Sequence, residues 1–337
     1  MANKKVLRSE FYGKKILITG GTGSIGIGLI KQLLSEKPKI IKIFTNDENS
    51  IFETIRKFGN NPTLNYQIGD IRDRDGLELA IRDIDIVFHA AAMKHVDICE
   101  ENPFDAVKTN VVGTSNVIEV SIKENISKFI LISTDKATLP STTLGASKLL
   151  AERLTINADN YRGQGKTIFA IVRFGNVIGS RGSVYQIFLD QIRRKQPLTV
   201  TDPRMTRFIM SIPDAAGLIL KAVKIAKGGE IFILKMPSVK IEELARSMIQ
   251  VCKISEKNTS SKIKVSKTRI HERFHEYLVT PDEISYCHDL GSMYKISKEK
   301  NNKKLNSKEF SSETAQKISK DNLRRVIKEL LDEYLPF

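Results

Sequence analysis

The chain has 337 residues, 41% of them hydrophobic and 28% charged, which is typical of a globular protein long enough, at roughly 150 residues per domain, for two lobes. No run approaches the roughly 18 apolar residues that span a bilayer, the N-terminus lacks the apolar segment of a secretory signal, and three widely spaced cysteines fit neither a disulfide framework nor a zinc site. The net charge of +15 is spread along the chain without a nucleic-acid motif, so we predict a cytoplasmic protein with no membrane insertion, no metal site and no nucleic-acid partner.

Apolar, β-branched runs separated by segments of helical period predict strands that alternate with helices. These runs cover residues 15–19, 40–44, 66–68, 84–89, 128–133, 167–173 and 229–234. Such alternation predicts a parallel sheet with helices on both faces. We therefore expect an α/β fold in which a Rossmann-like, doubly wound parallel sheet carries a smaller C-terminal substrate-binding lobe.

The first predicted strand runs directly into a glycine-rich turn. Gly20, Gly23 and Gly26 stand at intervals of three residues, and an amphipathic helix follows them. This spacing permits a tight turn, lets backbone N–H groups approach a pyrophosphate and allows close helix packing. The cofactor contacts that we predict here are Gly20, Thr22, Gly23, Ser24, Ile25 and Gly26.

Acidic and small residues after the next strands extend the predicted site. Asp47 follows the second strand, where a carboxylate accepts hydrogen bonds from a ribose hydroxyl and favours NAD. A 2′-phosphate on NADP would favour an arginine at this point, and none follows before Arg56. Asp70, after the third strand, can meet the adenine amino group. The further cofactor contacts that we predict are Asn46, Asp47, Asp70, Ile71, Ala90, Ala91 and Ala92.

The later part of the chain predicts the division into lobes. From about Ser238 the pattern changes to short helices with polar links, and a terminal helix is expected at 319–331. The predicted parts are an NAD(P)-binding Rossmann domain (1–178, rejoined by 205–235), a substrate-binding lobe (179–204 and 236–300), and a polar linker with a C-terminal helix (301–337).

With these elements placed, the chain resembles the extended short-chain dehydrogenase/reductases, and within them the polysaccharide-biosynthesis group that includes UDP-N-acetylglucosamine 4,6-dehydratases. The resemblance rests on TGGTGSIG at 19–26, HAAAMKHVD at 89–97, STDKA at 133–137, GASK at 145–148, RFGNVIGSRGSV at 173–184, TDPRMTRF at 201–208 and GGEIFI at 228–233. STDKA, RFGNV and TDPRMTRF are specific to this group. The resemblance implies a nucleotide-sugar substrate, an NAD or NADP cofactor and a homo-oligomer.

The resemblance also implies roles for single residues. Asn110 resembles an asparagine that stabilises the active-site helix beside the cofactor, Lys94 a residue that touches cofactor and substrate, and Lys148 the lysine that binds the nicotinamide ribose. The implied substrate contacts are Lys94, Asn176, Arg204, Arg207, Glu272 and Arg273, and an arginine fork suits phosphate oxygens. The family often has Ser-Arg-Asp where residues 45–47 are Thr-Asn-Asp, and loss of that arginine again favours NAD. His271 stands where the family has a glycine.

The family reaction has three steps, which the resemblance assigns to one short segment. A hydride leaves C4 of the hexose for the cofactor, water is lost across C5 and C6, and the hydride returns to C6. Thr134 would bond the 4-oxygen, Lys136 would remove the C5 proton, and Asp135 would protonate the leaving 6-hydroxyl. Lys136 must be neutral to act as a base, and we expect burial and the charge of Lys148 to lower its pKa from about 10.4.

The catalytic segment departs from most short-chain dehydrogenases at one position. Leu144 stands four residues before Lys148, where most of these enzymes have a tyrosine that takes the hydroxyl proton as the hydride leaves. Some members of the dehydratase group have methionine there, so an apolar residue is compatible with activity. We hypothesise that Asp135 takes the 4-hydroxyl proton, through Thr134 or a water, and passes it on at the elimination step.

Three interpretations follow from these residues. The leading one is a nucleotide-sugar 4,6-dehydratase, acting on UDP-N-acetylglucosamine with C5 inversion left open, for synthesis of a surface-glycan sugar. A 4-epimerase is the enzymatic alternative, although epimerases of this fold do not need the pair of Asp135 and Lys136 and usually retain the tyrosine. A non-catalytic protein that binds NAD or a nucleotide sugar is the third, and Leu144 keeps it open.

Overall fold

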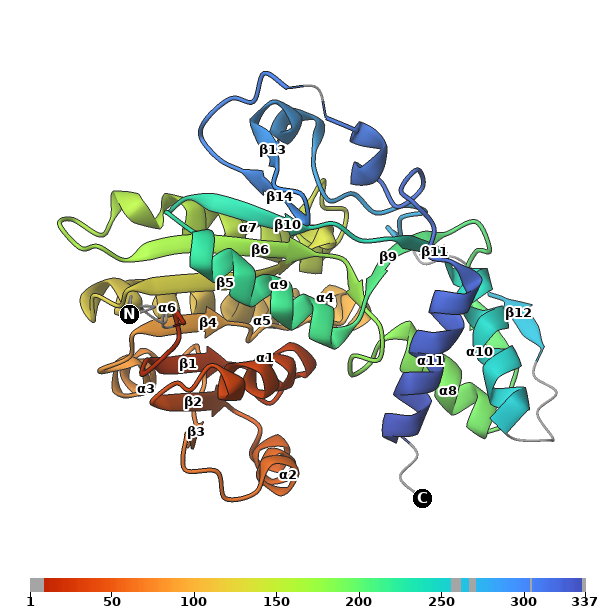
Figure 1. Cartoon of the computed structure of the whole chain (residues 1–337), viewed down its shortest axis with the longest axis horizontal. Coiled ribbons are helices and arrows are strands. Elements are labelled where there is room, and N and C mark those ends of the chain that lie inside the picture. The colour runs from red at the N-terminus through yellow and green to blue at the C-terminus, as the bar shows by residue number, and fades with distance from the viewer. Residues whose placement is uncertain (1–8, 256–261, 267–270, 304, 335–337) are drawn as a thin grey trace, which may run out of the picture.

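The computed structural model describes residues 9–255, 262–266, 271–303 and 305–334, so most of the N-terminal segment on which the secretory-signal prediction rests lies outside the described residues. Among these residues, a nine-stranded sheet forms the centre of the larger lobe, in the order β13-β14-β10-β6-β5-β4-β1-β2-β3 (Figure 1). Its strands are β1 (Lys15–Thr19), β2 (Ile40–Thr45), β3 (Leu64–Ile68), β4 (Ile86–His89), β5 (Lys128–Thr134), β6 (Ile168–Phe174), β10 (Glu230–Leu234), β13 (Cys287–Asp289) and β14 (Met293–Ile296).

Seven of these strands, β1 to β6 and β10, lie where the apolar runs predict them. From β3 to β10 in the sheet order they run parallel, whereas β14 and β13 add to the edge in antiparallel pairs. In the central strand β5, every residue between its two ends is buried, because a parallel sheet is covered on both faces. The predicted α/β fold with a doubly wound parallel sheet is confirmed.

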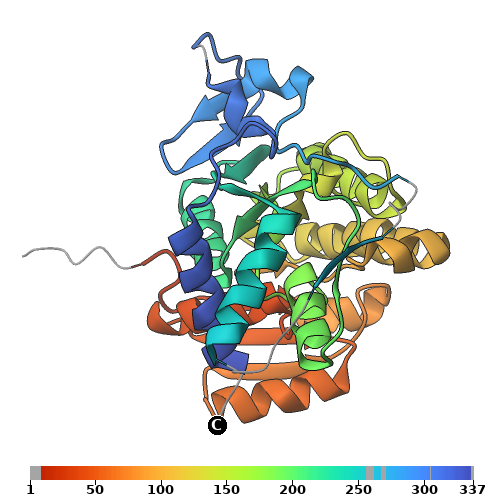
Figure 2. The ribbon, with the colours of Figure 1, turned by 90° about the vertical axis from the view of Figure 1, so that its right-hand side faces the viewer.

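Helices cover both faces of this sheet. Helices α1 and α9 contact each other on one face, and α6 contacts both α3 and α7 on the other (Figures 1 and 2). The helices of this lobe are α1 (Ser24–Ser35), α2 (Glu48–Phe58), α3 (Arg74–Ile81), α4 (Val96–Glu101), α5 (Pro103–Val107), the π-helix η1 (Lys108–Gly113), α6 (Thr114–Lys123), α7 (Thr143–Asn157) and α9 (Ile212–Ile225). Short 3-10 turns are η2 (Asp135–Ala137), η3 (Ala158–Asn160), η4 (Pro281–Tyr286) and η5 (Ser307–Phe310).

The smaller lobe has its own apolar core. Tyr185 and Phe188 from α8 pack there with Met248 from α10 and Leu323 from α11. Its elements are α8 (Val184–Arg193), β8 (Leu198–Val200), α10 (Ile241–Ser255), β12 (Ile263–Val265) and α11 (Lys320–Tyr334). A separate three-stranded sheet has the order β11-β9-β7. Its strands are β7 (Asn176–Val177), β9 (Thr206–Met210) and β11 (Ser238–Lys240).

The predicted division into lobes is wrong at three points. Strands β13 and β14, expected in the substrate-binding lobe, extend the main sheet, because buried Met293 and Tyr294 pair against β10. Helix α11 belongs to the core of the smaller lobe rather than to a separate tail. Helix α10 is 15 residues long, although only short helices were predicted after Ser238. Strands of three or four residues inside polar segments have too little periodicity to be recognised in a sequence.

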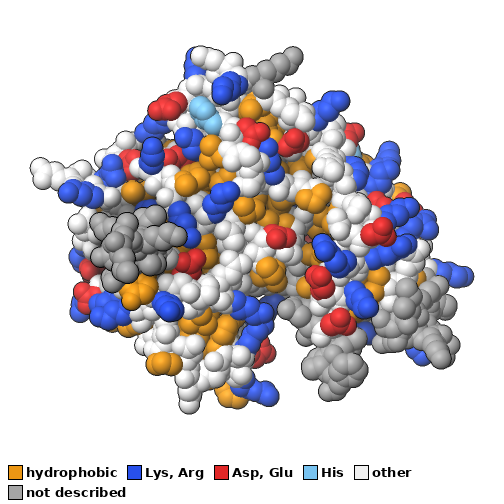
Figure 3. All heavy atoms as spheres, in the orientation of Figure 1, with side chains coloured by type: hydrophobic (Ala, Val, Ile, Leu, Met, Phe, Trp, Pro, Cys, Tyr) orange, Lys and Arg blue, Asp and Glu red, His pale blue; other side chains and the backbone are white. Residues whose placement is uncertain are grey.

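The positive charge of the chain does not gather in one area of the visible face. Figure 3 shows lysine and arginine side chains interspersed with aspartate and glutamate. Ion pairs also occur elsewhere among the described residues: Lys123 lies 2.7 Å from Glu78, and Arg246 lies 2.6 Å from Glu242. On this face the charge is therefore mixed in sign.

Candidate active site

The glycine turn after β1 has room for no larger residue. Gly20 has φ +64°, and a Cβ there would lie 2.8 Å from the backbone of Ala91. A Cβ on Gly26 would lie 2.3 Å from the carbonyl oxygen of Gly21. The close approach places the N-terminus of α1, with its unpaired backbone N–H groups, at the wall of a cavity. This is the geometry that binds the pyrophosphate of a dinucleotide.

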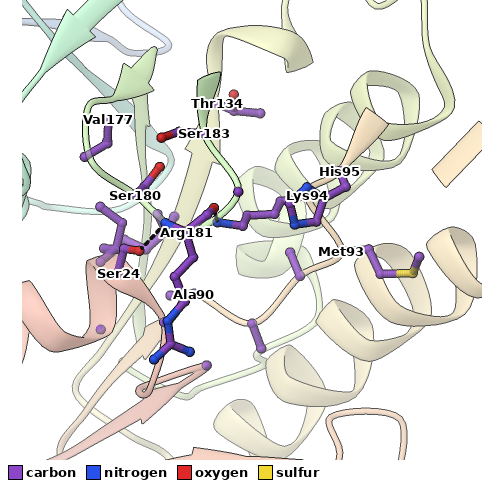
Figure 4. A pocket seen from close by; sticks show the side chains of 18 of the residues that line it. Ser24, Ala90, Met93, Lys94, His95, Thr134, Val177, Ser180, Arg181 and Ser183 are labelled. Atoms are coloured by element: carbon purple, nitrogen blue, oxygen red, sulfur yellow. Dashed lines mark hydrogen bonds between the residues drawn. The ribbon is translucent and has the colours of Figure 1, made fainter. Parts of the chain in front are cut away.

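A cavity of about 770 Å³ opens at the carboxyl ends of the parallel strands and reaches the smaller lobe. That volume is in the range of ligand sites. Figure 4 shows part of it, with side chains from both lobes around one space. The sequence-predicted residues that line it are Gly20, Thr22, Gly23, Ser24, Ile25, Gly26, Asn46, Asp47, Asp70, Ile71, Ala90, Ala91, Ala92, Lys94, Thr134, Lys136, Lys148, Asn176 and Arg207.

The carboxylates of Asp47 and Asp70 line one end of this cavity, where strands β2 and β3 end. Asp47 caps α2 by accepting hydrogen bonds from the backbone and hydroxyl of Ser50, which lower the pKa of Asp47. Asp70 accepts bonds from Arg72 and Asn46, and the bonds from Arg72 are the main cause that lowers the pKa of Asp70 to about 2. Both groups are therefore ionised at neutral pH. Their charge suits hydroxyl donors and opposes an additional phosphate.

The predicted catalytic residues come together where β5 ends and η2 begins. The Thr134 hydroxyl donates to Asp135 Oδ1 at 2.9 Å, and Lys136 Nζ donates to the same oxygen at 3.0 Å and to Asn176 Oδ1 at 3.2 Å. Thr134 and Lys136 line the cavity, but Asp135 is fully buried behind them. Asp135 therefore does not line the cavity itself, and its predicted role as acid to the leaving hydroxyl stays a prediction that requires a relay. The Thr134 hydroxyl and Lys136 Nζ, which both donate to Asp135 Oδ1, are two groups that could carry its protons.

The charge of Lys136 is set by a residue that sequence reasoning did not single out. Glu276 is buried, with Oε1 3.7 Å from Lys136 Nζ and 3.8 Å from Arg207 Nε. Burial alone would lower the pKa of Lys136, but the carboxylates of Asp135 and Glu276 outweigh burial and raise that pKa above its ordinary value. The expectation of a lowered pKa is thus wrong, because the two carboxylates favour the charged form of Lys136.

Lys148 and Leu144 lie on neighbouring turns of α7. Burial lowers the pKa of Lys148 to about 8, and its Nζ donates to the carbonyl oxygen of Ile132 at 2.8 Å. Leu144 packs against Cys99 and Ala106 while it lines the cavity. The wall beside Lys148 is therefore apolar, without the phenol of other family members.

Asn110 connects two parts of the site from behind. Its side chain accepts from the backbone N–H of Met93 at 2.8 Å, and donates to the Met93 carbonyl at 3.1 Å and to the Ser147 hydroxyl at 3.0 Å. These bonds tie the segment after β4 to α7. Asn110 is buried and does not line the cavity, so it is placed to support the active-site helix and not to contact a cofactor directly.

The substrate-side predictions divide into two groups. Asn176 and Arg207 line the cavity, whereas Arg204, Glu272 and Arg273 do not. The side chain of Arg204 is 74% exposed, because it lies in the turn before β9 and pairs with its neighbour in that turn. Arg273 donates to the carbonyl of residue 138, and Glu272 lies 3.4 Å from Arg207. These three residues are therefore corrected from cavity contacts to supporting or surface positions.

His271 adopts a glycine-like backbone conformation. Its φ is +68°, in the left-handed region that L-residues with a Cβ rarely occupy. The chain thus keeps the shape that a glycine would have at this position, although the residue is histidine.

Arg181 is a cavity residue that the sequence reasoning missed. Its backbone N–H donates to Ser24 Oγ at 3.0 Å, and Lys94 Nζ donates to its carbonyl oxygen at 2.6 Å (Figure 4). Its guanidinium donates to Ser50 Oγ at 3.0 Å and lies 3.2 Å from Glu53. The sequence signal for this residue was an arginine within the motif SRGS. Its position at the cavity could not be predicted from that motif, because its partner Ser24 is 157 residues away in the chain.

A Gly20→Ala variant is expected to lose stability and affinity for a dinucleotide together. A Cβ at φ +64° costs about 1 kcal/mol, and the clash with Ala91 displaces the turn further, so NADH binding should weaken about tenfold or more. Gly59→Ala is the matched control, since Gly59 has the same φ and no atom near its Cβ position. Urea denaturation and NADH fluorescence titration measure both effects. Equal NADH affinity in the two variants would contradict the assignment of the turn.

The described residues offer neither a metal-binding cluster nor a membrane-spanning helix. In the described part of the chain, no group of three or more histidine, cysteine, aspartate or glutamate side chains is placed to hold a metal ion. Over the same residues, none of the helices combines the length and the apolar character needed to cross a bilayer.

The chain matches the family model described as "Polysaccharide biosynthesis protein" over residues 16–298. A Methanocaldococcus jannaschii protein described as an uncharacterized membrane protein is 47% identical over 330 residues, covering 96% of this chain and 98% of the relative. A UDP-N-acetylglucosamine 4,6-dehydratase (inverting) of Campylobacter jejuni is 42% identical, covering 85% and 84%. A UDP-glucose 4-epimerase of Rickettsia bellii is 40% identical, covering 85% and 83%.

Among solved structures, the chain is similar to that of Pen from Bacillus thuringiensis. The TM-score is 0.88 at 40% sequence identity, and the match covers 97% of this chain and 99% of the other. The coverage includes the smaller lobe, so the likeness extends over both lobes of the fold.

Proposed function

The chain belongs to the polysaccharide biosynthesis protein family, and from this premise we propose that it is a nucleotide-sugar 4,6-dehydratase that acts on UDP-N-acetylglucosamine. The observation that carries the proposal is the hydrogen-bonded group of Thr134, Asp135 and Lys136 at the cavity wall. An acid and a base placed together suit removal of water, whereas epimerisation needs only oxidation and reduction at C4.

The cofactor is NAD. The glycine turn and the N-terminus of α1 fit a pyrophosphate, and the ionised Asp47 and Asp70 fit an adenosine with free ribose hydroxyls. Bound at this turn, NAD would supply hydride acceptance from C4 of the sugar and hydride return to C6. Lys148, which lines the cavity, would bind the nicotinamide ribose.

The residues around the sugar move two protons. The Asp135 carboxyl, whose pKa is raised by burial, accepts the 4-hydroxyl proton through the Thr134 hydroxyl and returns it by the same route to the departing 6-hydroxyl, which leaves as water. Lys136, once neutral, removes the C5 proton, which the 4-ketone has made acidic, and later protonates C5. After one reaction cycle, Asp135 and Lys136 have each returned to the protonation state in which they started.

The apolar side chain of Leu144 is consistent with these two proton-transfer roles. Because Leu144 is apolar and lines the cavity, another group must remove the proton from the 4-hydroxyl. Thr134 and Lys136 both line the cavity and both donate to Asp135 Oδ1. Lys136 acts on the C5 proton, so the Thr134 hydroxyl carries the 4-hydroxyl proton.

A 4-epimerase is the second candidate, because relatives named UDP-glucose 4-epimerase match 85% of this chain at 40% identity. An epimerase would transfer the hydride at C4 alone and would leave Asp135 and Lys136 without a reaction step. The buried carboxylate of Asp135 beside Lys136 therefore favours the dehydratase.

Incubation with UDP-N-acetylglucosamine and NAD in D₂O, followed by proton NMR, tests the proposal. We expect a new 6-methyl signal and deuterium at C5, since the base exchanges its proton with solvent. Inverted geometry at C5 would show in the coupling constants of the ring. A change at C4 alone would support the epimerase, and bound sugar without turnover would contradict both enzymes.

A further inference from the structure

Residues 180–183, which we call the clasp, bridge the two walls of the cavity. The clasp enters α8 of the smaller lobe, yet its bonds go to the larger lobe: to Ser24 at the start of α1 and to Lys94 after β4. Gly182 has φ +66°, and a Cβ there would lie 2.2 Å from the ring of His95. The clasp is thus fitted against the segment that follows β4, over the place where a pyrophosphate would lie.

Among the described residues, the Arg181 guanidinium has two side-chain partners, the Ser50 hydroxyl at 3.0 Å and the Glu53 carboxylate at 3.2 Å, and the only charged one of the two is exposed. The side chains of Arg181 and Glu53 are 49% and 68% exposed, and exposed pairs of this kind contribute little. Other cations that line the cavity have firmer partners: Arg72 makes a bidentate bond to Asp70, and Arg207 contacts buried Glu276. Arg181 is therefore the guanidinium that can change partners at least cost.

We propose that Arg181 binds the dinucleotide pyrophosphate, with phosphate oxygens replacing the Glu53 carboxylate, so that the clasp retains the cofactor between turnovers. The guanidinium fork matches two phosphate oxygens, and such charge-assisted bonds are stronger than neutral ones. The inference rests on the proposed function for the identity of the cofactor. Retention suits that reaction, because the hydride returns to the sugar and the cofactor has no need to leave.

The dissociation rate of NADH, measured by stopped-flow fluorescence without any sugar, tests this role. Arg181→Gln should dissociate about 10 to 100 times faster than the wild type, because one charge-assisted contact is lost. Glu53→Gln should dissociate more slowly, since the competitor for Arg181 is removed. Arg246→Gln is the matched control: Arg246 also pairs with an exposed-surface glutamate, but on α10, and should leave the rate unchanged.

The two variants separate a cofactor contact from a structural link. Faster dissociation in both Arg181→Gln and Glu53→Gln would mean that the pair only holds the clasp, and would overturn the proposal. An unchanged rate in Arg181→Gln, or no NADH binding by the wild type, would overturn it as well. Opposite shifts in the two variants support it, even if the NMR assay shows no dehydration, because the binding measurement involves no sugar.

Discussion

A Lys136→Met variant is expected to form product about 10²- to 10⁴-fold more slowly than the wild type while it still binds NADH. Lys136 lines the cavity, and its Nζ donates a hydrogen bond to Asp135 Oδ1 at 3.0 Å. The variant therefore loses both the proposed C5 base and the hydrogen-bond donor to Asp135. Methionine keeps the length and apolar stem of the side chain. Product formation is measured by proton NMR, and deuterium exchange at C5 should be lost in parallel.

Glu276→Gln provides the control for this role. The carboxylate of Glu276 raises the pKa of Lys136, so neutral Lys136 is scarce at neutral pH and the rate should rise with pH. Removal of that negative charge lowers the pKa, and the rising limb of the pH profile should shift to lower pH. A limb that stays in place, or a Lys136→Met variant that turns over at the native rate, would contradict the assignment of Lys136 as the base.

An Arg173→Met variant is expected to be less stable by about 3–5 kcal/mol, the loss typical of breaking a buried ion pair from one side. Arg173 on β6 is 1% exposed and lies 2.6 Å from Glu152 on α7 and 2.9 Å from Glu283 in η4. Glu152 also accepts a bond from Ser133, the residue before Thr134. Methionine would leave a buried carboxylate unpaired beside the catalytic segment. Urea denaturation measures the change in the free energy of unfolding.

Two further variants test whether the cause is the unpaired charge. Arg246→Met removes an exposed pair and should cost about 0.5 kcal/mol or less. Arg173→Met combined with Glu152→Gln should recover part of the loss, because no charge at residue 152 remains buried. A double variant as unstable as the sum of the single ones would show that the two residues contribute independently, against this explanation.

The sequence was sufficient to predict those structural features that depend on residues close together in the chain. Gly20, Gly23 and Gly26 belong to one turn, and the apolar runs before and after them are continuous, so the strand, the turn and the helix were predicted together. STDKA was placed correctly at the carboxyl end of β5 for the same reason. Short-range sterics and hydrophobic periodicity are properties of neighbouring residues.

The tertiary structure decided what depends on distant neighbours. Burial of Asp135 behind Thr134, and the charged state of Lys136 beside Glu276, follow from how β5 meets a segment far along the chain. In the same way Arg204 turns to solvent, whereas Arg181 reaches across to α2. The sequence by itself therefore determined the fold and the residue types of the site, while packing decided which side chains face the cavity and what charge they carry. The physical reason is that burial and Coulomb interactions depend on distance in space, whereas sequence patterns report only distance along the chain.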